Sequence, residues 1–147
     1  MKQYCAMTVN GPIEGSAMGT TYVHEHLLVK PQSDDMKYRD YTLDDWEKSA
    51  RESESFYRAG GRTLVEMTPI HYGRDVRGYR AIARKAHIHV ICTTGFHKEE
   101  FMPDWFGDWS EDDLYEIVRK EILEGIDGTD IRPGVIKFGT SYGTITK

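Results

Sequence analysis

Segments that favour β-strands and segments that favour α-helices alternate along this chain. β-Branched and apolar residues fill four stretches, at 20–26, 63–68, 89–94 and 134–139. Amphipathic patterns typical of helices fill 42–59, 75–86 and a third stretch that begins at Ser110. Regular alternation of this kind is typical of right-handed βαβ units, whose strands form a parallel sheet covered by helices. We therefore expect an α/β fold with four parallel strands and three helices.

Residues at the ends of the predicted helices indicate where these helices begin and stop. Thr42 is a candidate N-cap for the first helix, with Asp45 three residues on, and Gly60-Gly61 follows its last turn. Asp75 is expected to cap the second helix. The apolar residues of that helix form one stripe, namely Val76, Tyr79, Ile82, Ala83 and Ala86.

The N-terminal residues form a short unit ahead of the first strand. Residues 4–9, a turn at Asn10-Gly11-Pro12 and the segment up to Gly15 predict a β-hairpin. We take 1–18 as this lead-in and 19–147 as the four strands with their helices. Two closures fit such a run, an open doubly wound sheet or part of a (β/α)8 barrel. No Gly-x-Gly-x-x-Gly follows any strand, which weakens a dinucleotide-binding open sheet.

The charge balance of the chain argues against several classes of partner. Lysine and arginine total 19 against 24 for aspartate and glutamate, a formal net charge of -5. An acidic balance without any basic run disfavours nucleic acid and anionic membranes as partners. The N-terminus lacks the apolar region of a signal peptide, and no apolar stretch reaches membrane-spanning length. We therefore expect a cytoplasmic protein without nucleic-acid or membrane partners.

Two histidines lie two positions apart in the first predicted strand. Successive side chains of a strand point to opposite faces, so His24 and His26 share a face and project side by side. Neutral imidazole is the commonest protein metal ligand, and two on one rigid strand lose little conformational freedom when a cation binds both. The pair predicts a metal site. The alternative is a pair of partly buried histidines that hydrogen-bond to the backbone.

A single lysine lies in the middle of the fourth predicted strand. Lys137 stands between Ile136 and Phe138, where a bare ammonium facing a core costs several kcal/mol unless it is paired or neutralised. Burial lowers the pKa of a lysine, which makes the amine a nucleophile, a base, or a group that takes up carbon dioxide as a carbamate. The alternative is a strand-edge lysine whose ammonium reaches water.

Other polar and aromatic side chains follow the predicted strands. In barrels the active site lies at the C-terminal ends of the strands. At these ends His71, Phe96 and His97 are candidates for a substrate pocket. Glu66 is a candidate acceptor for the ring of a metal-ligating histidine, and the alternative is an ordinary buried, hydrogen-bonded carboxylate.

Several short motifs in a fixed order resemble one known family. They are Gly19-Thr20, His24-Glu25-His26, Gly60-Gly61, Gly73-Arg74-Asp75-Val76, Thr93-Thr94-Gly95 and Gly134-Val135-Ile136-Lys137. Together they resemble the phosphotriesterase family of the amidohydrolase superfamily, which includes the phosphotriesterase-like lactonases. Each motif is weak, whereas the ordered set is strong and extends from about Gly11 to Thr140.

The resemblance implies a (β/α)8 barrel of TIM type with two divalent metal ions, usually zinc. By position, His24 and His26 would bind the more buried ion, and Lys137, carboxylated on its amine, would bridge both. A hydroxide held between the ions is the nucleophile in such enzymes. The implied reaction is the opening of a lactone or the cleavage of a carboxylic ester. Phosphotriester or phosphodiester hydrolysis is the runner-up because the same site serves both.

The resemblance also implies residues that these 147 positions do not contain. In the family, strands five and six each supply a histidine ligand, and strand eight supplies an aspartate that moves protons. A full barrel takes about 250 residues, so we expect an N-terminal half completed by a C-terminal half-barrel from the same gene or a second chain. An incomplete sequence and a homodimer are further interpretations. The non-enzymatic alternative is an inactive half-barrel that binds a metal or a partner protein.

One position departs from the family in a way that bears on substrate. Relatives tend to place an aromatic residue where this chain has His97. Together with His71, this histidine suggests a polar substrate.

Overall fold

A computed structural model of the chain describes residues 4–30, 40–98, 101–102 and 104–140. The strands are β1 (Cys5–Thr8), β2 (Gly11–Glu14), β3 (Thr20–Glu25), β4 (Gly61–Glu66), β5 (His89–Phe96) and β6 (Val135–Phe138). The α-helices are α1 (Trp46–Arg58), α2 (Val76–Ala86) and α3 (Glu111–Glu124), and short 3-10 helices lie at η1 (Gly15–Ala17) and η4 (Asp104–Asp108). Among the described residues, no helix is long and apolar enough to cross a membrane.

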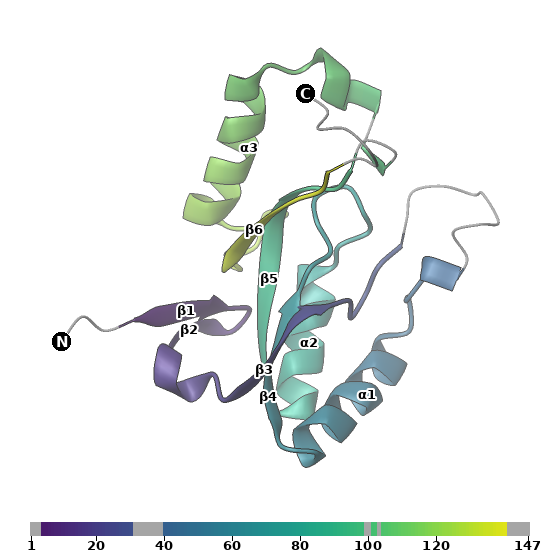
Figure 1. Cartoon of the computed structure of the whole chain (residues 1–147), viewed down its shortest axis with the longest axis vertical. Coiled ribbons are helices and arrows are strands. Elements are labelled where there is room, and N and C mark those ends of the chain that lie inside the picture. Colours follow the sequence, from purple (N-terminus) through teal and green to yellow (C-terminus); the bar gives the residue numbers. More distant parts are fainter. Residues whose placement is uncertain (1–3, 31–39, 99–100, 103, 141–147) are drawn as a thin grey trace.

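Four of these strands form one parallel sheet in the order β3-β4-β5-β6. A helix connects each strand to the next, with α1 and α2 side by side and α3 against β5 (Figure 1). Neighbours in the sheet are also neighbours in the sequence, which is the order of strands in a (β/α)8 barrel. The predicted fold class is confirmed, since the four parallel strands and three helices form half of such a barrel.

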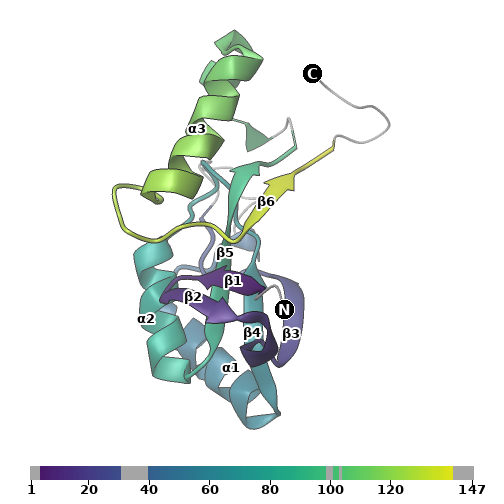
Figure 2. The ribbon, with the colours of Figure 1, turned by 90° about the vertical axis from the view of Figure 1, so that its left-hand side faces the viewer.

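The N-terminal hairpin covers the end of the sheet at which β5 begins. β1 and β2 pair in antiparallel fashion, as the sequence predicted. Val9, which follows β1, donates its N–H to the carbonyl oxygen of Val90 at 2.8 Å, and the hairpin crosses in front of β5 in Figure 2. Because Val90 lies at the N-terminal end of β5, the hairpin leaves the C-terminal ends of the strands free.

The second helix follows its sequence pattern, whereas the first begins later than predicted. The Asp75 side chain accepts a hydrogen bond from the N–H of Gly78 at 2.9 Å, and the predicted apolar stripe of α2 is buried. The N-cap of α1 is Asp45, so the prediction of Thr42 is wrong. Val29 and Leu43 exchange backbone hydrogen bonds of 3.0 and 2.8 Å, which hold the chain extended just after Thr42. The backbone groups of Leu43 are therefore already paired with Val29 and do not form part of a helical turn.

A buried ion pair joins α3 to the segment that precedes α2. Arg74 donates from Nη2 to Oε1 of Glu121 at 2.6 Å and from Nη1 to Oε2 at 3.0 Å. The Arg74 side chain is 4% exposed and that of Glu121 is 11% exposed. Arg74 also donates to the carbonyl oxygen of Thr93 in β5 at 3.2 Å. A bidentate pair of this kind fixes α3 in orientation as well as in distance.

The apolar core lies between the sheet and α2, and the outer face of the last strand lies open. Tyr79, Ile82, Val90 and Cys92 are among the fully buried residues of that core. By contrast, Phe138 on β6 is 71% exposed. Side chains of α3 and of η4 line an apolar groove along this strand. Exposed apolar surface on an edge strand is normally covered by further structure.

Candidate metal centre

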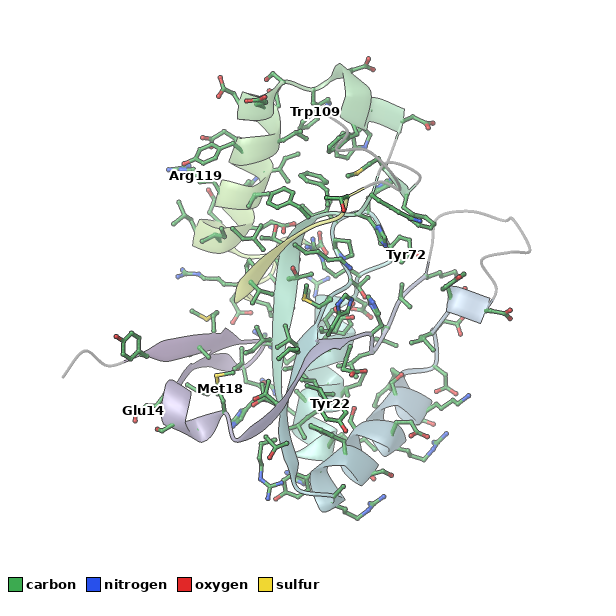
Figure 3. The ribbon with its side chains drawn as sticks, in the orientation of Figure 1. Glu14, Met18, Tyr22, Tyr72, Trp109 and Arg119 are labelled. Carbon is green, nitrogen blue, oxygen red and sulfur yellow. The ribbon has the colours of Figure 1, made fainter. Side chains whose placement is uncertain are left out.

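A bulge in the first barrel strand decides which way the histidine pair faces. Tyr22 pairs with Leu64 and Glu25 with Glu66, so three residue steps on β3 match two on β4. One extra residue in a strand reverses the alternation of its side chains. The Tyr22 ring packs on Phe56 of α1 with centroids 4.7 Å apart (Tyr22 is labelled in Figure 3). The bulge therefore separates Tyr22, which faces the helices, from the histidines that follow.

The two histidine rings lie next to each other, as their spacing predicted. The ring centroids of His24 and His26 are 5.5 Å apart. Burial, followed by the charges of Lys137 and His26, lowers the pKa of His24. A lowered pKa favours the neutral ring at neutral pH, and the neutral ring is the form that binds metals.

A fully buried carboxylate lies behind His26, and a threonine stands between them. Glu66 has no exposed surface, and its Oε1 lies 3.7 Å from Nδ1 of His26. The Thr68 hydroxyl donates to the same Oε1 at 2.6 Å and lies 2.8 Å from Nδ1 of His26. Glu66 also accepts backbone hydrogen bonds from Thr68 at 3.1 Å and from Leu27 at 3.4 Å. Glu66 therefore contacts His26 chiefly through Thr68, a residue that sequence reasoning did not single out.

Lys137 points into the same region from the other edge of the sheet. Its Nζ donates to the carbonyl oxygen of Met67, just past β4, at 3.0 Å. Burial lowers the pKa of Lys137, and the charge of Glu66 opposes that shift. Within the described residues, Lys137 forms no ion pair. Lys137 is therefore half-buried, with its amine hydrogen-bonded to the backbone.

Lys137 on β6 and the histidine pair on β3 are linked through the backbone of Met67. Adjacent strands lie about 4.8 Å apart, so a flat sheet would separate β3 from β6 by about 14 Å. Lys137 nevertheless donates to the Met67 carbonyl oxygen at 3.0 Å, and Met67 donates its N–H to the carbonyl oxygen of Glu25, between the two histidines, at 2.9 Å. Strands of a barrel curve around a common axis, so residues on the inner face converge. The close approach of β6 needs Gly95, where a Cβ would lie 2.1 Å from the carbonyl oxygen of Lys137.

Two of the predicted pocket residues lie on loops that follow the strands. His71 has a positive φ of 64°, and its ring meets that of Trp105 with centroids 6.0 Å apart. The ring of His97 packs on Tyr72 (labelled in Figure 3) with centroids 4.9 Å apart, and on Phe101 at 4.7 Å. Both histidines therefore form part of an aromatic rim after β4 and β5.

The third predicted pocket residue lies elsewhere. Phe96 is 2% exposed and packs on Phe106 of η4 with ring centroids 5.1 Å apart. By strand alternation it shares a face with Val90 and Cys92, which belong to the core under α2. The structure does not bring Phe96 to the histidine pair.

The donors that meet here fit part of a metal site. Imidazole nitrogens suit zinc, copper, iron and nickel ions. A lysine binds a metal only after its amine loses a proton or gains a carboxylate. Tetrahedral zinc takes four donors. Among the described residues, no group of three or more His, Cys, Asp or Glu side chains is placed so that it could hold a metal ion. His24, His26 and Lys137 therefore represent a partial donor set.

This sequence is similar to a family model and to individual proteins of the same family. Residues 5–147 match the model of the phosphotriesterase family. A phospho-furanose lactonase from Mycoplasmopsis agalactiae is 30% identical over 156 residues, which cover 95% of this chain and 44% of that protein. The phosphotriesterase homology protein of Escherichia coli is 33% identical over 129 residues, which cover 87% of this chain and 44% of that protein.

The fold of this chain is also similar to solved structures. The crystal structure of an amidohydrolase from Mycoplasma synoviae matches with a TM-score of 0.91 at 29% sequence identity, over 99% of this chain and 46% of that one. The chain thus spans about half the length of the relatives that it matches. Because the family model extends over nearly all of the sequence, this chain belongs to the phosphotriesterase family.

Proposed function

We propose that residues 1–147 are the N-terminal half of a metal-dependent hydrolase barrel, with 1–18 as its hairpin lead-in. In its complete form the enzyme opens a lactone or cleaves a carboxylic ester. One observation carries the proposal. Lys137, near the end of the chain, donates to the Met67 carbonyl oxygen, and Met67 donates its N–H to Glu25, which lies between His24 and His26 near the start of the chain. This contact lies at the C-terminal end of a parallel sheet. Active sites of barrel enzymes lie at this end.

Each of the three side chains has a distinct role in this proposal. His24 and His26 hold the first of two divalent cations, and zinc is the expected metal because imidazole suits it. The neutral amine of Lys137 adds to carbon dioxide, so that an N–C bond forms and one proton leaves. The carbamate that results would offer two oxygens as ligands for divalent cations at this site. When bound, the two ions polarise the carbonyl under attack and lower the pKa of water.

The burial of Lys137 favours this modification. Carbon dioxide reacts with the unprotonated amine, and burial lowers the pKa of Lys137, so more of the amine is unprotonated at neutral pH. The Met67 carbonyl oxygen accepts from the amine and holds it on the inner side of the sheet. His71 and His97 on the aromatic rim give the pocket polar groups, which suit a polar ester or lactone.

The proposal requires structure beyond these residues. The exposed apolar face of β6 and the incomplete donor set both call for a C-terminal half-barrel. That half comes from the same gene or from a second chain, and a homodimer of this chain is a further arrangement to be tested by its mass in solution.

Lactone or carboxylic ester is the first choice of substrate because a relative at 30% identity is named a phospho-furanose lactonase. Phosphotriester or phosphodiester hydrolysis is the second candidate, since the chain belongs to the phosphotriesterase family and the same donors would serve both reactions. An inactive half-barrel that binds a metal or a protein partner is the competing class.

Metal analysis combined with turnover tests the proposal. The complete protein is expected to hold about two divalent ions per site and to hydrolyse a lactone from a panel that also includes phosphotriesters. Lys137→Ala should abolish binding of the second ion. Lys120→Ala, an exposed lysine on α3, is the matched control and should retain both ions. A complete protein that holds no metal and hydrolyses no member of the panel would contradict the proposal.

A further inference from the structure

The Thr68 hydroxyl lies at the centre of the polar cluster behind His26 and has one proton to donate. Three acceptors lie within reach, namely Oε1 of Glu66 at 2.6 Å, Nδ1 of His26 at 2.8 Å and the carbonyl oxygen of Leu28 at 3.5 Å. A hydroxyl donates one hydrogen bond and accepts up to two. The direction of its single proton therefore decides whether Nδ1 of His26 donates to Thr68 or accepts from it.

The surrounding contacts assign that proton to Glu66. The Leu28 oxygen already accepts from the Tyr79 hydroxyl at 2.8 Å, and burial raises the pKa of this phenol, which keeps it a donor. Both oxygens of Glu66 already act as acceptors, Oε1 toward the N–H of Leu27 and Oε2 toward the N–H of Thr68. The contact of 2.6 Å between Thr68 and Glu66 has the length of a charge-assisted O–H···O⁻ bond.

His26 must then act as the donor toward Thr68. Since the hydroxyl proton points at Glu66, the oxygen of Thr68 faces Nδ1 of His26 with a lone pair. Nδ1 carries the proton in that arrangement, and the neutral ring keeps its lone pair on Nε2. We propose that Thr68 is a positioning residue. Because it donates to buried Glu66, it accepts from Nδ1 of His26, and it so fixes the tautomer of His26 that can bind a metal through Nε2.

This inference rests on the proposed function for its purpose, and its first test needs no metal. Two-bond 1H–15N spectra of the metal-free, 15N-histidine-labelled protein report which ring nitrogen carries the proton. The spectra are recorded over a series of pH values, and the tautomer is read where the ring signals no longer change as the pH rises. His26 is identified by the signals that disappear in His26→Asn. The expected result is protonation on Nδ1.

Substitutions at Thr68 then separate the hydroxyl from the shape of the side chain. Thr68→Val keeps the shape, and it should abolish the preference for the Nδ1 proton and weaken zinc binding by about 10- to 100-fold. Thr68→Ser returns the hydroxyl and should restore both. Thr63→Val is the matched control because Thr63 is an equally buried residue of β4 whose hydroxyl donates to Met18 at 2.6 Å, away from His26.

The outcomes distinguish the hydrogen-bond chain from Glu66 through Thr68 to His26, called the relay from here on, from the proposed function. Protonation of wild-type His26 on Nε2 overturns the relay, and this measurement decides the matter even where Thr68→Val fails to fold. A Thr68→Val protein with the wild-type tautomer and zinc affinity also overturns it. A wild-type protein that has the Nδ1 proton and binds no zinc leaves the relay supported and contradicts the metal-dependent function.

Discussion

Replacement of Glu121 by glutamine removes the charge from the ion pair that holds α3. The amide keeps the length of the side chain, but it turns an N–H2 group toward the Arg74 guanidinium, which has only donors. Removal of one partner of a buried ion pair costs about 3–5 kcal/mol because the other charge stays buried. Arg74 still contacts Thr93 O at 3.2 Å and Asp127 Oδ1 at 3.4 Å. We therefore expect a loss near the lower limit, about 3 kcal/mol.

Urea denaturation measures this loss as a shift of the transition midpoint. For m-values of about 1–3 kcal/mol/M, a loss of about 3 kcal/mol lowers the midpoint by roughly 1–3 M. Glu116→Gln is the matched control on the same helix, since Glu116 is 61% exposed and pairs with Arg119 at 3.2 Å. An exposed pair contributes about 0–1 kcal/mol, so its midpoint should scarcely change. Equal shifts for the two variants would refute the assignment of Arg74–Glu121 as the contact that anchors α3.

Three further predictions concern the sheet edge, the thiols and the lysine. Gly95→Ala should destabilise the protein far more than Gly60→Ala in denaturant, because both glycines have φ near +100° whereas only at Gly95 does a Cβ meet the backbone of Lys137. Equal losses would mean that backbone strain alone matters. In the native protein Cys5 should react with a disulfide reagent at about pH 8 and Cys92 only after unfolding, because Cys5 is exposed and burial raises the pKa of Cys92 to about 12. Rapid labelling of both thiols in the folded protein would contradict this. After metal removal, bicarbonate added together with zinc should restore more activity than zinc alone, since the Lys137 carbamate has to form again. Indifference to bicarbonate would count against a carboxylated lysine.

The local features of the fold could be predicted from sequence because their causes lie within a few residues. The Asp75 cap and the apolar stripe of α2 depend on contacts between residues three or four apart, and both are confirmed. The hairpin of β1 and β2 depends on a short turn in the same way. The predicted start of α1 was wrong because its cause is distant in the sequence, namely the pairing of Leu43 with Val29.

The features of the candidate site also differ in whether their cause is local or distant in the sequence. The proximity of His24 and His26 follows from a spacing of two in an extended strand, which sequence alone determined. The tertiary structure decided which face they share, because a bulge against β4 separates them from Tyr22. It also decided that Lys137 is linked to the histidine strand through Met67 and that Thr68 stands between Glu66 and His26. The contacts of His26 with Thr68 and Glu66 and the contact of Lys137 with Met67 join residues 40 or more positions apart, and only the pairing and curvature of the sheet bring such residues together.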